Sequence, residues 1–112
     1  MKQYTKSELA SILNLHKAWI IGEDYGKRAN LSRADLREAD LSRADLDYSG
    51  LPLWCGSLSA HFDDRQLKQI AYHLVKAGLQ SKNASDETQA ELRKLIQFAN
   101  GFHRAEECGF IE

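Results

Sequence analysis

The sequence lacks several features that define large classes of proteins. It has two cysteines, Cys55 and Cys108, which are too few for a disulfide framework and favour a reducing, intracellular setting. No apolar run reaches the roughly 18 residues that a membrane span needs. Residues 1–8 lead into an amphipathic pattern with acidic residues, unlike a secretory signal. These absences predict a soluble, cytoplasmic protein with no membrane segment.

An excess of charge of one sign is also missing. The chain has 15 Lys and Arg against 16 Asp and Glu, a formal net charge of −1, and its three parts, residues 1–26, 27–53 and 54–112, are each close to neutral. A basic surface that binds nucleic acid needs a local excess of Lys and Arg. The charge balance therefore argues against direct binding to nucleic acid.

Enzyme and metal-site motifs are absent as well. The potential metal ligands are Cys55, His61, His73, His103 and Cys108, and none of their spacings is typical of a zinc site. Cys108 lies five residues after His103, so the two would point to different sides of a helix, and Glu106 and Glu107 are only adjacent. No phosphate-binding glycine loop or nucleophile motif is present. We predict no catalysis, no metal and no cofactor.

What the sequence does contain is a period of five residues between 29 and 53. Four quintets each begin with alanine, continue with Asp or Asn and place leucine third, and a degenerate copy follows at 49–53. In an α-helix, leucines five apart would be rotated by about 140° from one another and would form no stripe. In a strand they would alternate between the two faces. A chain that changes direction every five residues puts all of them in one interior.

This pattern resembles the pentapeptide-repeat family. The resemblance implies a right-handed quadrilateral β-helix, in which four pentapeptides make one coil and the leucine and the small residue two before it point inward. The implied interior consists of Leu31, Leu36, Leu41, Leu46 and Leu51 together with Ala29, Ala34, Ala39, Ala44 and Ser49. The repeats amount to little more than one coil, and the open ends of such a stack need caps.

Helices are predicted on both sides of the repeats and can supply these caps. Thr5 and Glu8 have the form of a capping box, and the apolar spacing that follows predicts a helix over residues 6–21, which Gly22 ends. Beyond the repeats, Asp63 and Ser85 are predicted N-caps. The first of these helices ends at Gly78 and the second at Gly109, and the predicted buried face of the first is Leu67, Ile70, Ala71, Leu74 and Val75.

The predicted fold class is therefore α+β: a short β-helix flanked by one N-terminal and two C-terminal α-helices. We expect a single domain over residues 1–112. Its parts are a capping helix and connector (1–28), the pentapeptide repeats (29–53) and a C-terminal helical part (54–112). No motif indicates an oligomeric state.

The order of these parts also resembles small pentapeptide-repeat proteins of phages and prophages. The matching pieces are residues 8–10, 16–19, 22–23, 50–54, 71–73 and 102–109, with the repeats. Larger members of the family protect DNA gyrase and resemble a DNA duplex with rows of acids. By analogy we expect an anti-CRISPR-like inhibitor of a host DNA-binding enzyme or CRISPR effector subunit, acting in the bacterial cytoplasm. The predicted partner-binding residues are Asp35, Glu38, Asp40, Asp45 and Asp47.

Two alternatives to this DNA mimicry stay open. Aspartates in a tightly turning chain also bond the backbone at corners, as Asx turns do. Alternatively, the protein is a structural interaction module that docks through apolar residues around Leu53, Trp54 and Phe62, with no role for charge.

Overall fold

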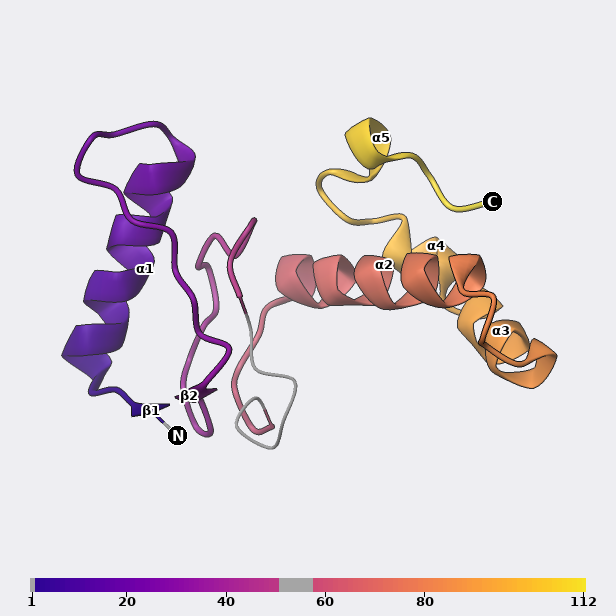
Figure 1. Ribbon diagram of the computed structural model, residues 1–112, viewed down its shortest axis with the longest axis horizontal. Coiled ribbons are helices and arrows are strands. Elements are labelled where there is room, and N and C mark those ends of the chain that lie inside the picture. The colour runs from indigo at the N-terminus through magenta and orange to yellow at the C-terminus, as the bar shows by residue number, and fades with distance from the viewer. Residues whose placement is uncertain (1, 51–57) are drawn as a thin grey trace. The chain divides into compact units, whose positions relative to one another are not determined.

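The computed structural model describes residues 2–50 and 58–112, which form two compact units, Met1–Phe62 and Asp63–Glu112 (Figure 1). The single-domain organisation stays a prediction. Leu51, Leu53, Trp54 and Cys55, to which the sequence assigned roles, lie outside the described residues.

Helix α1 (Lys6–Ile20) begins at the predicted capping box. The Glu8 N–H donates to Thr5 Oγ1 at 3.0 Å, and the Thr5 N–H donates to Glu8 Oε1 at 3.0 Å. After the helix, Gly22 has a φ of 88°, a conformation that glycine adopts without steric cost. The connector then returns along the helix, and the Lys27 N–H donates to Leu15 O at 2.9 Å. The predicted N-terminal helix is confirmed.

The repeats form a coil that meets itself again after four quintets. Asn30 pairs with Gly50 in a parallel bridge. The Leu31 N–H donates to Gly50 O at 2.8 Å, and the Gly50 N–H donates to Ala29 O at 3.2 Å. A continuous α-helix would separate residues 30 and 50 by about 30 Å along its axis, and an extended strand by about 65 Å. Both alternatives are therefore excluded, and the segment is β-helix-like.

The chain turns at the end of each quintet. The carbonyl of each third-position leucine accepts from the N–H that opens the next quintet, in the pairs Leu31–Ala34 (2.9 Å), Leu36–Ala39 (2.9 Å), Leu41–Ala44 (3.0 Å) and Leu46–Ser49 (3.1 Å). Glu38, Arg43 and Tyr48 have φ values of 67°, 70° and 64°, the sign that the third residue of a type II turn requires. The change of direction every five residues is what the leucine period predicts.

Segments from outside the repeats pair with the coil on both sides. Strand β1 (Lys2–Gln3) lies parallel to β2 (Ala34–Asp35), and the Lys2 N–H donates to Arg33 O at 2.9 Å. Asp40 pairs with His61, whose N–H donates to Ala39 O at 2.7 Å. The carbonyls that bond Gly50 and His61 belong to Ala29 and Ala39, at the first position of a quintet. The carbonyl that bonds Lys2 belongs to Arg33, at the last position of a quintet. Because successive carbonyls of a strand point in opposite directions, β1 lies on the side of the coil opposite Gly50 and His61.

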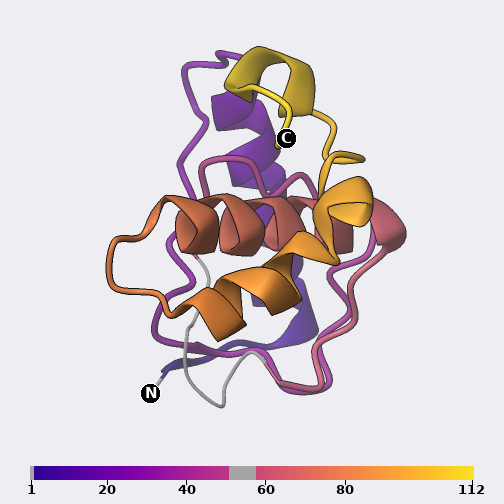
Figure 2. The ribbon, with the colours of Figure 1, turned by 90° about the vertical axis from the view of Figure 1, so that its right-hand side faces the viewer.

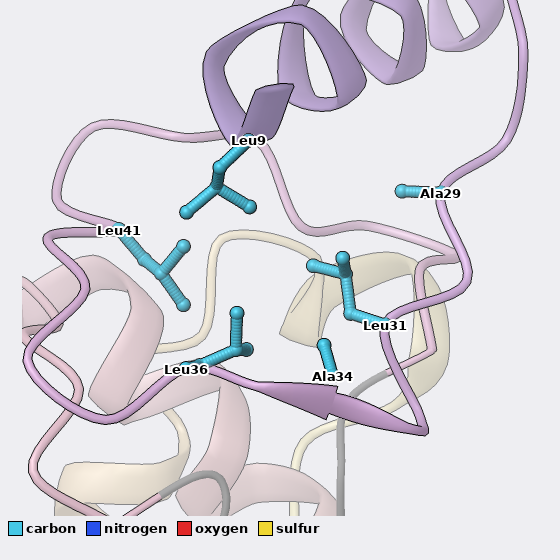
Figure 3. Packing of buried hydrophobic residues seen from close by; sticks show 6 residues of the cluster. All are labelled: Leu9, Ala29, Leu31, Ala34, Leu36 and Leu41. Carbon is cyan, nitrogen blue, oxygen red and sulfur yellow. The ribbon is translucent and has the colours of Figure 1, made fainter. Parts of the chain in front are cut away.

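The leucines fill the interior of the coil. Leu31 and Leu41 are 0% exposed, Leu36 is 1% exposed and Leu46 is 6% exposed. Leu9 of α1 points in among Leu31, Leu36 and Leu41, so α1 covers one open end of the coil (Figure 3). Of the small residues at the first quintet position, Ala29 and Ala34 are buried, while Ala39, Ala44 and Ser49 are half-buried. Phe62 and Tyr4 pack around the same cluster.

The second unit begins with α2 (Asp64–Gln80), and Asp63 caps this helix as predicted. The helix runs to Gln80, two residues beyond the predicted end at Gly78. Its predicted apolar face is only partly buried. Val75 is 0% exposed, but Leu67, Ile70 and Leu74 are 42%, 40% and 54% exposed, and the buried residues instead include Gln66 and Tyr72.

The prediction of one further helix ending at Gly109 is wrong. Ser85 caps α3 (Asp86–Arg93) as predicted, but α4 (Ile96–Ala99) and α5 (Ala105–Cys108) follow as separate short helices. Figure 2 shows α3 and α4 beside α2. Directly after α4, the Asn100 side chain bonds both the N–H and the carbonyl of Ile111 at 2.8 Å and so holds the chain end back against this helix. The folded-back chain buries Phe102 and Ala105 against Tyr72 and Val75.

Candidate interaction surface

Polar residues at the second position of three quintets bond the backbone at the corner that follows. In each case a side-chain Oδ1 accepts the N–H two residues later, from Asn30 to Ser32 (3.1 Å), from Asp35 to Arg37 (3.2 Å) and from Asp40 to Ser42 (3.0 Å). These are Asx turns. Asp35 and Asp40 therefore shape the coil, as one of the two alternatives expects.

Asp35 is also paired with a cation. Arg37 donates from Nε to Oδ1 at 2.9 Å and from Nη2 to Oδ2 at 2.7 Å, and the Asp35 side chain is only 9% exposed. The hydrogen bonds from the Arg37 side chain hold the pKa of the Asp35 carboxyl well below its usual range. Since its charge is balanced by the adjacent guanidinium, Asp35 contributes little negative potential outward.

Asp40 lies exposed on the next side of the coil. Hydrogen bonds from the side chain and backbone of Ser42, with smaller contributions from nearby His61 and Arg43, lower the pKa of the Asp40 carboxyl. Asp40 is therefore a fixed, ionised carboxylate at the surface.

The remaining three predicted contact residues differ from one another. Glu38 is exposed at a corner, Asp45 is half-buried, and Asp47 is buried at 8% exposure. The sequence pattern placed all three outside the coil, but the corner at Asp47 lies against α1. Glu38 and Asp40 are therefore the exposed predicted acids of the coil, and we call these two residues the acidic corner.

The main-chain oxygen of Asp47 is contacted by His16 of α1, which is 0% exposed. Its Nδ1 accepts the Ala29 N–H at 3.0 Å, so Nε2 carries the ring proton and donates to Asp47 O at 2.6 Å. The sequence placed His16 on the apolar face of the helix but gave no sign of this bridge. His16 therefore connects α1 to the first and fourth sides of the coil.

Beside His16 an aromatic pair reaches the surface. The Trp19 ring stacks on the His16 ring at a centroid distance of 5.8 Å and meets the Tyr48 ring edge-on at 6.0 Å. Trp19 is 38% exposed and Tyr48 is 57% exposed. This aromatic pair is an apolar surface on the first unit. Phe62, which the sequence suggested for that role, is half-buried against the coil interior.

Within residues 2–50 and 58–112, no group of three or more His, Cys, Asp and Glu side chains is placed to hold a metal ion. Cys108 is an exposed free thiol. No helix in these ranges combines the length and apolar character that crossing a membrane demands.

A coil with five-residue sides that pairs with itself after four of them defines a β-helix-like repeat protein. Residues 27–51 match the family model described as pentapeptide repeats (8 copies), and this segment of the chain belongs to that family. The resemblance of the repeats to the pentapeptide-repeat family is thereby confirmed, whereas the resemblance to phage and prophage members stays a prediction. Proteins with such repeats are often non-catalytic modules for protein interaction. Neither a curated protein nor a solved structure matches the chain.

Proposed function

We propose that this protein is a non-catalytic binding protein whose short, right-handed quadrilateral β-helix presents carboxylates to a basic, nucleic-acid-binding surface of a host protein. The observation that carries the proposal is the placement of Glu38 and Asp40. Both are exposed, and they lie two residues apart on a coil whose third side is hydrogen-bonded to His61.

The physical argument concerns preorganisation. A carboxylate held by the backbone loses little conformational entropy on binding, so more of its attraction to an arginine or lysine becomes affinity. Asp40 is held in this way by Ser42 at 3.0 Å. Carboxylates at fixed positions can replace the phosphates of a nucleic acid in a basic groove, and one coil is long enough to replace only a few of them.

The resemblance to small phage and prophage proteins supports the choice of partner. We propose a host DNA-binding enzyme or a CRISPR effector subunit, which the protein inhibits in the bacterial cytoplasm by occupying its DNA-binding surface. The protein itself is not expected to bind nucleic acid.

The experiment has two stages. The full chain, tagged, captures its partner from a bacterial lysate, and the identified partner is then titrated with wild-type and variant protein in competition with duplex DNA. The double variant Glu38→Gln/Asp40→Asn removes two charges, and the Asx turn should survive because Asn30 makes the same bond as Asp40. We expect an affinity loss of about tenfold or more and a steep salt dependence between about 50 and 200 mM. The control Glu106→Gln lies outside the coil and should bind as wild type.

The aromatic pair supports a second candidate function, docking to an apolar surface of a protein. Trp19 and Tyr48 contact each other at the surface, and aromatic residues are enriched at the centres of interfaces. The variant Tyr48→Asn distinguishes the two candidates, because asparagine tolerates the φ of 64° at this corner. If Tyr48→Asn loses the partner while Glu38→Gln/Asp40→Asn binds it as wild type does, the aromatic pair is the binding surface and the acidic corner is not.

A further inference from the structure

A groove in the first unit lies apart from the acidic corner and the aromatic pair. Its volume is about 340 Å³, and its lining residues are Tyr4, Ile12, Leu15, Lys27, Arg28, Ala29 and Asn30. Sites for small organic ligands occupy roughly 300–1,000 Å³. The groove is therefore large enough for a small molecule, between α1 and the segment that enters the coil.

The lining separates into an apolar part and a cationic part. Tyr4, Ile12 and Leu15 are half-buried and supply the apolar surface. Lys27 and Arg28 are exposed, and neither forms an ion pair in the structure described for this chain. Among the described residues that line the groove, none carries a carboxylate. The groove therefore combines an apolar wall with two positive charges that nothing in the lining neutralises.

Asn30 adds a donor whose orientation is fixed. Its Oδ1 accepts both the N–H of Ser32 at 3.1 Å and the hydroxyl of Ser32 at 2.7 Å. Because the oxygen is used in the Asx turn, the Nδ2 group is the part of the amide left to donate to a ligand. An ammonium, a guanidinium and an amide N–H together recognise the oxygens of an anion.

We infer that this groove binds a small organic anion with an apolar body, of the class of medium-chain carboxylates. The carboxylate meets Lys27, Arg28 and the Asn30 amide, and the alkyl chain lies along Tyr4, Ile12 and Leu15. Burial of the chain supplies affinity, and the three donors select an acid over an alcohol. This inference is independent of the proposed partner.

Titration of the full chain with octanoate, followed by amide NMR shifts, tests the inference. We expect saturable shifts at residues 27–30, with octan-1-ol and acetate each binding at least about tenfold more weakly, since one lacks the charge and the other the chain. The variant Asn30→Asp is the sharpest test. Aspartate makes the same Asx turn at positions 35 and 40, so the fold is kept while a donor becomes a repelling carboxylate. We expect about a tenfold loss of octanoate affinity.

A second variant, Lys27→Gln/Arg28→Gln, removes both cations without touching the coil and should also weaken octanoate binding by about tenfold or more. Lys17→Gln, on α1 but outside the lining, is the matched control and should bind as wild type. Equal affinity for octanoate and octan-1-ol, or wild-type octanoate affinity in both variants, would overturn the inference, as would an absence of saturable shifts at residues 27–30.

Discussion

The Nε2 atom of His16 donates to the main-chain oxygen of Asp47 at 2.6 Å, while Nδ1 of the same ring accepts the Ala29 N–H at 3.0 Å. One buried imidazole thus satisfies a donor from the start of the coil and an acceptor from its last regular corner. Residues 29 and 47 belong to quintets on adjoining sides, so the ring ties the beginning of the coil to its end.

Replacing His16 should destabilise the first unit. The variant His16→Leu fills similar volume but leaves the Ala29 N–H and the Asp47 carbonyl without their partner, at a cost of about 2–4 kcal/mol. Urea denaturation followed by tryptophan fluorescence measures the change, because Trp19 stacks on His16. His73→Leu, at an exposed position on α2, should change stability by less than about 1 kcal/mol. Equal stability of the two variants would show that the bridge contributes nothing.

Glycine at a corner should stabilise the coil where φ is positive. Glu38 has a φ of 67°, which a side chain disfavours by about 1 kcal/mol. The variant Glu38→Gly should therefore keep or raise the free energy of unfolding by up to about 1 kcal/mol. Arg33 holds the same quintet position but is not among the residues with positive φ. Arg33→Gly should lower the free energy of unfolding by about 0.5–1 kcal/mol, which urea denaturation measures. A less stable Glu38→Gly than Arg33→Gly would contradict this turn geometry.

Acid should weaken the coil. The pKa values of Asp35 and Asp40 lie below the ordinary 3.8 in the folded state, owing to hydrogen bonds from Arg37 and Ser42. Unfolding therefore takes up protons in acid. The stability from these two carboxylates is complete above about pH 4–5 and is lost as pH falls through the lower folded-state values. Urea midpoints from about pH 2 to pH 6 measure this loss, and Asp35→Asn/Asp40→Asn should flatten the curve. An equally steep curve in the double variant would assign the acid sensitivity to other groups.

Close packing at Gly26 should forbid a side chain. A Cβ at this position would fall onto the backbone of Trp19 and Ala18, where the connector crosses the end of α1. Gly26→Ala should lower the free energy of unfolding by roughly 2–4 kcal/mol. At Gly22 the space is open and φ is 88°, so Gly22→Asn should cost less than about 1 kcal/mol. Thermal denaturation of the two variants compares the destabilisation caused by the steric clash at Gly26 with that caused by the backbone conformation at Gly22. A destabilisation below about 1 kcal/mol in Gly26→Ala would mean that the connector can move away from α1.

The sequence could predict the coil because the five-residue period of its leucines fits neither a helix nor a strand. It could not predict β1, because Lys2 and Gln3 carry no strand pattern and pair with β2 only in the folded chain. The C-terminal helix shows the same limit. Apolar spacing continues through residues 92–103, but helix α4 ends at Ala99, and the bonds that Asn100 then makes to Ile111 form only in the folded chain.

The acidic surface was only partly predictable for a related reason. Asp35, Asp40, Asp45 and Asp47 look alike in the sequence, and the quintet pattern assigns all of them to the outside. Their differences come from neighbours: Arg37 pairs with Asp35, and His16, 31 residues away, bonds the main-chain oxygen of Asp47. The repeat pattern predicts which residues leave the interior, but contacts with Arg37 and with α1 decide how each of these acids is surrounded.

The pairing of Asn30 with Gly50 also sets the increments by which this chain can grow. Inserting one quintet would rotate every later residue by a quarter turn and carry His61 away from Asp40. Inserting four quintets would add a complete layer about 4.8 Å thick and return the later residues to their original orientation. Blocks of twenty residues are thus the natural unit for lengthening the coil while the residues after it keep their orientation.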